Sequence, residues 1–206
     1  RTSPKTQAAL LEVMEEGSVT VDGITHVLPK PFICIATQNH YGTAGTQALP
    51  ESQLDRFMIR LSIGYPGRDS QVQILKERHG IGDLDLVQPR MTRDDIREIQ
   101  GYLYSVKIVD DILYYVADLC AATREEPMVE LGVSPRGASA LTRIARARAV
   151  LRERDYVIPE DIQAVFHDVC AHRLVLKPQA KIEGITADDI LDKIIKKIKA
   201  PALGRK

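Results

Sequence analysis

One stretch of this sequence reads Leu49-Pro50-Glu51-Ser52-Gln53-Leu54-Asp55-Arg56-Phe57, and it joins a polar, glycine-containing loop to an apolar run. An arginine at such a junction lies at the rim of a predicted strand rather than inside it. Its planar, permanently charged guanidinium is suited to phosphate. Upstream, Ala36-Thr37-Gln38-Asn39 forms a second polar tip on another apolar run. An amide and a guanidinium at the ends of two strands are the kind of pair that a nucleotide site needs.

The composition predicts a soluble globular protein of one or two domains. The chain has 206 residues, of which 44% are hydrophobic and 27% charged, with a formal net charge of zero. That balance argues against a non-specific nucleic-acid binder. No apolar run approaches the ~20 residues of a membrane span, and no signal-peptide core is present. Three widely spaced cysteines in apolar surroundings, Cys34, Cys120 and Cys170, are interpreted as reduced core residues of a cytoplasmic protein.

The first part of the chain is predicted to mix helix and strand. Ser3 and Pro4 open a helix that Gly17 ends. Residues 19–28 form a predicted hairpin around an Asp-Gly turn. The continuous apolar run at 32–36 is typical of a strand covered on both faces, as in a parallel sheet, and residues 56–63 are a second strand candidate.

Gly64-Tyr65-Pro66-Gly67 breaks this pattern and is predicted to be a hinge between two domains. Residues 1–66 would be the C-terminal part of an α/β core, 67–200 an all-α lid domain, and 201–206 a tail. Two strands alone leave unpaired edges, so the missing strands and a phosphate-binding loop are expected before Arg1. Helices are expected at residues 69–79, 92–104, 110–124, 134–152 and 159–172, and from 186 onward. Thr92, Ser134 and Thr186 are expected to cap three of these helices, with Asp95 at the capping-box position after Thr92.

Six segments, in this order, resemble motifs of the MoxR family of AAA+ ATPases, and the resemblance extends to about residue 200. In that family they are the helix after the Walker B acids, a hairpin, sensor 1, the arginine finger, sensor 2 and a late lid signature. Here they read Ser3-Pro4-Lys5-Thr6-Gln7, Val19-Thr20-Val21-Asp22-Gly23, Ala36-Thr37-Gln38-Asn39, Leu49 to Phe57, Ser134-Pro135-Arg136-Gly137, and Val169-Cys170-Ala171-His172-Arg173-Leu174.

The resemblance implies a role for three residues. Asn39 would orient the attacking water opposite the γ-phosphate of ATP. Arg56 would reach the ATP of a neighbouring subunit and stabilise the transition state. Arg136 would contact the γ-phosphate from the lid and couple the lid angle to the nucleotide. The simpler interpretations are a turn-forming Asn39, an Arg56 paired with Asp55 or Glu51, and a solvated Arg136.

The family implies an ATP- and Mg²⁺-dependent, chaperone-like remodelling activity in a ring that is expected to be hexameric. The client is expected to be a protein under maturation, often a metal-cofactor enzyme, and a von Willebrand A domain protein is an expected partner. The sequence departs from the family in two places. Thr43 and Ala44 stand where acidic residues are usual, and no Gly-x-x-x-x-Gly-Lys-Ser/Thr loop or Walker B acid pair is present. The chain alone is therefore expected to be inactive, with Mg²⁺ ligands outside it.

Two other interpretations stay open. The chain could be a non-catalytic module for oligomerisation or partner binding, or part of an AAA+ protein that acts on DNA, although the neutral charge makes nucleic acid an unfavoured partner. His167, Cys170 and His172 do not share one helix face, so no metal site is expected there.

Overall fold

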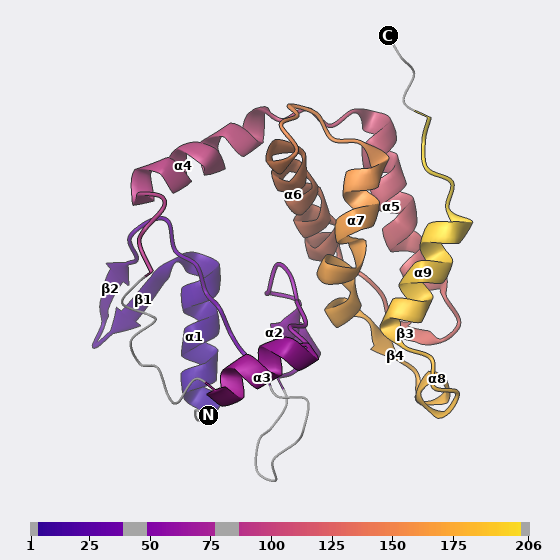
Figure 1. Ribbon diagram of the computed structural model, residues 1–206, viewed down its shortest axis with the longest axis horizontal. Coiled ribbons are helices and arrows are strands. Elements are labelled where there is room, and N and C mark those ends of the chain that lie inside the picture. Colours follow the sequence, from indigo (N-terminus) through magenta and orange to yellow (C-terminus); the bar gives the residue numbers. More distant parts are fainter. Residues whose placement is uncertain (1–3, 39–48, 77–86, 203–206) are drawn as a thin grey trace.

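The computed structural model describes residues 4–38, 49–76 and 87–202. A small N-terminal part contains a helix and a hairpin, and a larger C-terminal part is a bundle of helices (Figure 1). Helix α4 spans the distance between them along one side of the molecule. The mostly helical, two-part order confirms the predicted fold class.

The first elements form as the sequence predicts. Helix α1 covers Pro4–Glu16 and ends at Gly17, whose φ of +61° is easy only for glycine. Strands β1 (Ser18–Val21) and β2 (Ile24–Val27) pair antiparallel, with Val21 opposite Ile24. Asp22 and Gly23 both have positive φ, as a tight type I′ hairpin turn requires.

The two further strands predicted for this part are not formed, and that prediction was wrong for this chain. Residues 32–36 and 56–63 form no strand, and Ile35 and Ile63 are 87% and 100% exposed. A parallel strand needs neighbours on both edges and cover on both faces, and the residues described here supply neither. Instead a short helix, α2 (Glu51–Leu54), and a turn carry the chain through Arg56.

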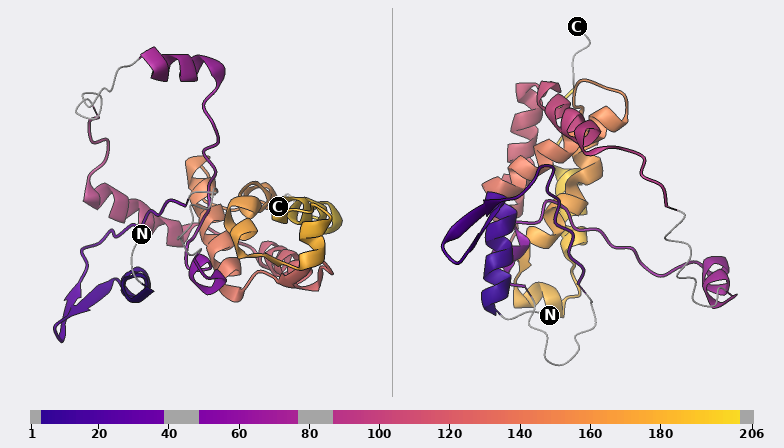
Figure 2. Two further views of the ribbon diagram at one scale, coloured as in Figure 1. Left: turned by 90° about the horizontal axis from the view of Figure 1, so that it is seen from below. Right: turned by 90° about the vertical axis from the view of Figure 1, so that its left-hand side faces the viewer.

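Two helices then lead to the bundle. Helix α3 covers Arg68–Lys76 and α4 covers Arg93–Tyr102, and neither has a buried residue. Both views of Figure 2 show α3 apart from the bundle. The predicted capping box of α4 is present: the Asp95 amide donates to Thr92 Oγ1 at 3.2 Å, and Asp95 Oδ2 accepts from the Thr92 amide at 2.7 Å. The hydrogen bond from the Thr92 amide is the main cause that lowers the pKa of the Asp95 carboxyl, and the Thr92 side chain acts in the same direction.

The bundle consists of α5 (Asp110–Glu125), α6 (Pro135–Leu151), α7 (Pro159–Cys170) and α9 (Ala187–Lys197). Short 3-10 turns follow α4 and α7, at Leu103–Ser105 (η2) and Ala171–Arg173 (η3). The sequence did not predict the small antiparallel ladder of β3 (Val129–Leu131) with β4 (Val175–Leu176), or the five-residue α8 (Pro178–Ile182). The bounds of the four main helices agree with their predicted spans within a few residues.

One hydrophobic core holds these helices together. Its largest fully buried side chains come from all four of them: Phe166, Ile112, Leu119, Leu141, Ile162, Leu191 and Ile194. Cys120 and Cys170 belong to this core, and burial raises the pKa of both thiols, that of Cys120 to about 11. Cys34 is exposed, so its predicted core position was wrong. The reason is that no described element packs over segment 32–36, in which Cys34 lies.

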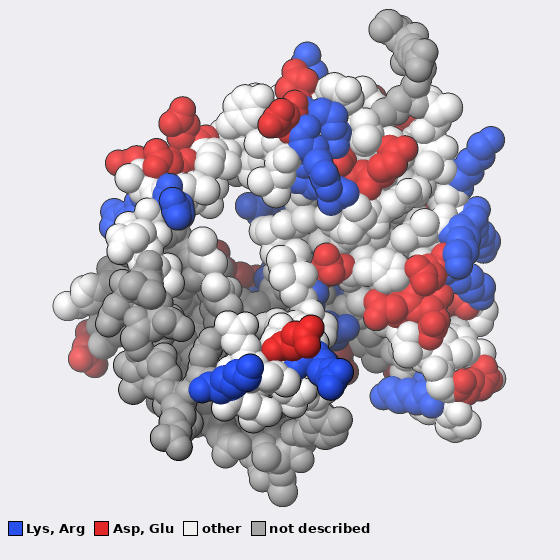
Figure 3. Space-filling model, in the orientation of Figure 1, with Lys and Arg blue, Asp and Glu red and all other residues white. Residues whose placement is uncertain are grey.

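The surface charge is mixed. On the face shown in Figure 3, Lys and Arg alternate with Asp and Glu over the bundle rather than gathering into one basic surface. Within the described residues, no helix combines the length and the apolar character needed to cross a bilayer.

Candidate phosphate-binding site

Two arginines from distant segments meet at one carboxylate. Glu15, in the last turn of α1, pairs through Oε2 with Nη1 of Arg56 and through Oε1 with Nη2 of Arg136. The three side chains remain 40%, 28% and 48% exposed, respectively. The structure therefore contains an anion held between the two arginines that the sequence singled out.

Helix polarity explains why this contact is favourable. Glu15 lies at the negative end of α1, which has no basic residue in its last turn. Arg136 lies at the second position of α6, at that helix's positive end. Each charge is unfavourable where it stands, and the ion pair relieves both.

The start of α6 fixes the backbone of Arg136. Ser134 is extended at φ −75° and ψ 166°, and its Oγ accepts from the Gly137 amide at 3.2 Å. Pro135 occupies the first helical position, where its missing N–H costs nothing. This confirms the predicted cap. Ser134 Oγ also donates to the Asp55 carboxylate, at 3.1 Å from each oxygen.

Arg173 anchors the Arg56 segment to the bundle. Its side chain is 2% exposed, and its Nε donates to Asp55 Oδ1 at 3.0 Å. Nη2 donates to the backbone oxygens of Asp55 (3.1 Å) and Phe57 (2.7 Å), and Nη1 to that of Met58 (3.3 Å). Burial lowers the pKa of Arg173, and the Asp55 carboxylate opposes that shift. Asp55 is thus bound to Arg173, and Arg56 forms its ion pair with Glu15 rather than with Asp55 or Glu51, the partners named in the simpler interpretation.

His172 completes this buried cluster as a neutral ring. Its Nε2 lies 3.0 Å from Phe57 O and 2.8 Å from Nη1 of Arg173, and its Nδ1 has no partner. Burial is the main cause that lowers the His172 pKa to about 4, and the Arg173 charge acts in the same direction. An imidazolium here would be buried against a guanidinium, which explains the preference for the neutral form.

The structure describes two of the three predicted site residues. Arg56 and Arg136 come together, as described. Asn39 lies outside the described residues, as does the loop with Thr43 and Ala44, so the proposed role of Asn39 stays a prediction. The hinge and the domain boundary after Pro66 likewise stay predictions.

Comparisons with known proteins agree with the motifs. The profile of the ATPase family associated with various cellular activities (AAA) matches residues 1–59, and that of the AAA lid domain matches residues 121–194. Chaperone MoxR1 of Mycobacterium tuberculosis is 34% identical to this chain, over 98% of the chain and 55% of the relative. The chain belongs to the MoxR family of AAA+ ATPases.

Other relatives of this MoxR family chain are also longer than it is. The uncharacterized protein YeaC of Bacillus subtilis is 45% identical over 98% of the chain and 63% of its own length. A solved structure of a candidate ATPase from Cytophaga hutchinsonii superposes with a TM-score of 0.89, at 34% identity, over 98% of this chain and 64% of that one. The chain thus spans about three fifths of the length of these relatives.

Sequence reasoning on this MoxR chain missed the residues that connect its arginines. Glu15 was not singled out, because an acidic residue in an amphipathic helix gives no signal of its own. Arg173 was quoted only as part of a late lid signature. One signal was available, since Arg173 follows His172 directly at the end of an apolar helix. An arginine that is buried at such a place needs a charged or polar partner, because arginine is rarely buried without one.

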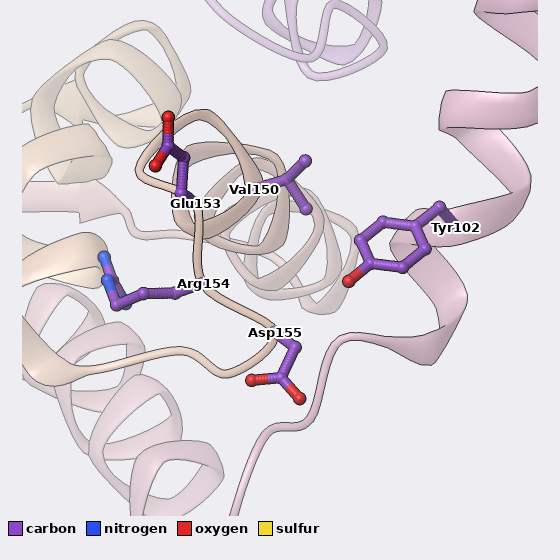
Figure 4. A pocket seen from close by; sticks show the side chains of 5 residues that line it. All are labelled: Tyr102, Val150, Glu153, Arg154 and Asp155. Carbon is purple, nitrogen blue, oxygen red and sulfur yellow. The ribbon is translucent and has the colours of Figure 1, made fainter.

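Other features of the MoxR chain lie away from this site. Within the described ranges, no group of three His, Cys, Asp or Glu side chains could hold a metal ion. His167 instead lies between Asp188 (3.0 Å) and Asp192 (3.1 Å) of α9. An open hollow at the C-terminal end of α6 is lined by Tyr102, Val150, Glu153, Arg154 and Asp155, and Tyr102 faces Val150 across it (Figure 4). Val150 lies fourteen residues after Arg136 in α6, which puts that hollow roughly 20 Å from Arg136 at ~1.5 Å per residue.

Proposed function

We propose that this chain is the part of a MoxR-type AAA+ ATPase that supplies an arginine pair to the terminal phosphate of ATP. The observation that carries the proposal is the shared contact of Arg56 and Arg136 with the Glu15 carboxylate. A phosphoryl oxygen is also an anionic acceptor that guanidinium binds well. The place that Glu15 occupies is therefore where a γ-phosphate would be bound.

The chemistry needs no covalent step from these residues. Negative charge spreads over the γ-phosphoryl oxygens during transfer, and a guanidinium placed there stabilises it, with effects of ~10³ or more in rate. By the family resemblance, Arg56 would act on the ATP of a neighbouring subunit. Because Arg136 of the same chain meets the same anion as Arg56, we expect both to serve that one nucleotide.

The phosphate would displace the Glu15 carboxylate from the two arginines. The two anions cannot share one pair of guanidinium groups at close range, since like charges repel strongly there. Glu15 lies at the end of a helix and is 40% exposed, so its side chain can rotate into solvent. ATP and Mg²⁺ are the proposed cofactors. The arginine pair fits the phosphate, whereas the Mg²⁺ expectation depends on the family alone.

The biological role is proposed from the family resemblance alone. We propose a homo-oligomeric ring, expected to be hexameric, in the cytoplasm, in which ATP turnover moves the lid and remodels a client. A protein under maturation, such as a metal-cofactor enzyme, and a von Willebrand A domain partner are proposed on the same basis. Turnover also needs a phosphate-binding loop, which this sequence does not contain.

The test uses the ATPase that carries this chain together with a phosphate-binding loop. Arg56→Ala should reduce the turnover rate by 100-fold or more, on the scale of such arginines, and leave ATP affinity within a few-fold. Arg60→Ala, four positions along the same segment, is the matched control and should turn over normally. An Arg56→Ala enzyme with wild-type turnover would show that the arginine assignment is wrong and would favour a non-catalytic binding module.

A further inference from the structure

Arg173 reaches both arginine-bearing segments at once. Its guanidinium binds the backbone oxygens of Asp55 and Phe57, the residues on either side of Arg56. It also binds the Asp55 carboxylate, which accepts a hydrogen bond from Ser134 Oγ. Helix α2, which leads into Arg56, lies against η3, which carries Arg173 (Figure 1).

The same contact extends to the start of α6. Ser134 Oγ, after donating to Asp55, accepts from the Gly137 amide, so it joins Asp55 to the first turn that carries Arg136. Gly137 itself lies under Arg173. A Cβ added at Gly137 would lie 2.8 Å from Arg173 Cδ and 2.6 Å from Val133 Cγ1. The backbone on both sides of Arg136 is therefore positioned against Arg173 or its partners.

A buried charge such as that of Arg173 adds little net stability to a fold, because it loses its hydration. A buried ion pair is often no more stabilising than apolar residues of the same size. It does fix geometry, because a planar guanidinium accepts partners only in set directions. Arg173 uses Nε, Nη2 and Nη1 on partners in three residues that flank Arg56, namely Asp55, Phe57 and Met58. A simple stabilising role does not require that number of aimed contacts.

We propose that Arg173 is a positioning residue that holds Arg56 and Arg136 in the register needed to bind one phosphate, acting through Asp55 and Ser134. This inference rests on the proposed function, because it assigns Arg173 to the same ATP-dependent site. Arg173 touches neither Glu15 nor a place where the phosphate would lie, so its effect is indirect.

The experiment measures kcat and KM for ATP in the ATPase that carries this chain. Arg173→Lys keeps the charge but loses the fork geometry, and it should lower kcat at least 10-fold with KM changed less than 3-fold. The same substitution is then made in an Arg56→Ala, Arg136→Ala background. There it should lower kcat less than 2-fold further, because no pair is left to position.

A second substitution leaves every polar group in place. Gly137→Ala should displace Arg173 and lower kcat at least 5-fold, whereas the control Gly101→Ala, in α4, has nothing within 4 Å of the added carbon and should have no effect. This variant decides the matter if Arg173→Lys does not fold. A Gly137→Ala enzyme with the activity of Gly101→Ala, or an Arg173→Lys loss that is equally large without the arginine pair, would overturn the proposal.

A readout without turnover separates this proposal from the function itself. In the isolated chain, Glu15→Gln should shift the Nε–Hε NMR signals of Arg56 and Arg136 together, and in the Gly137→Ala variant it should no longer shift both. Loss of that joint response supports positioning even if Arg56→Ala leaves turnover unchanged, which would refute only the ATPase assignment. An unaltered joint response in Gly137→Ala refutes the positioning role alone.

Discussion

The N-terminal part and the helical bundle both contain apolar runs, but the two parts bury these runs to different extents. In the bundle, residues such as Ile162 and Leu119 are fully buried, whereas Ile35 and Ile63 of the N-terminal part are 87% and 100% exposed. The bundle helices find their partners within the chain. The apolar runs of the first part find no covering element among the described residues. The comparison shows that an apolar run is buried only where another element packs against it. The sequence of the run alone does not reveal whether such an element is present.

The first prediction tests this contrast with one substitution at two places. Ile162→Ala removes fully buried carbon from the bundle core and should lower the free energy of unfolding by about 2–5 kcal/mol. Ile63→Ala removes carbon that is already in water and should change it by less than ~0.5 kcal/mol. Urea denaturation followed by circular dichroism measures both. Equal losses would mean that the two regions share one core.

The second prediction concerns the boundary between the regions, where His172 contacts Phe57. Its pKa of about 4 is below the ordinary value of ~6.5, so the unfolded chain binds a proton between these pH values that the folded chain does not. Above about pH 6.5, His172 is neutral in both states and the free energy of unfolding is undiminished. On acidification toward pH 4 the unfolded chain is protonated first, so the free energy of unfolding should fall by on the order of 2–3 kcal/mol. Stability measured against pH should flatten in His172→Gln.

The control for that prediction lies in the other region. His26 is exposed on β2, so His26→Gln serves as the matched control and should not reproduce the effect of His172→Gln. A profile that keeps its full slope in His172→Gln would assign the acid sensitivity to other groups and would contradict the buried, neutral state of this ring.

The third and smallest effect compares two helix caps. Thr186 caps α9, which buries Ile190, Leu191 and Ile194, so Thr186→Ala should lower the stability of the bundle by about 1 kcal/mol. Thr92 caps α4 with the same capping box, but α4 buries no residue. Thr92→Ala should therefore reduce local helicity with little change in the main thermal transition. A large shift in that transition from Thr92→Ala would show that α4 folds with the bundle.

The local elements could be predicted from the sequence because their signals are local. Ser134-Pro135 opens α6, Thr92 and Thr186 cap their helices, and Asp22-Gly23 turns the hairpin, as predicted. The strands could not, because strand formation depends on neighbours that a single segment does not reveal. In the site, Arg56 and Arg136 could be singled out by their flanking residues. Their meeting at Glu15 could not, since it depends on where the end of α1 is placed relative to the start of α6.

The central claim is that Arg56 and Arg136 of one chain serve the same phosphate, and a double-mutant cycle on ATP turnover tests it most directly. The kcat values of Arg56→Ala, Arg136→Ala and the double variant are compared with wild type, in the ATPase that carries this chain with a phosphate-binding loop. Residues that act as a unit are strongly non-additive. We expect the double variant to turn over within about 3-fold of the slower single variant. A double variant slower by the product of the two single losses would contradict the account, because it would mean that the arginines act independently.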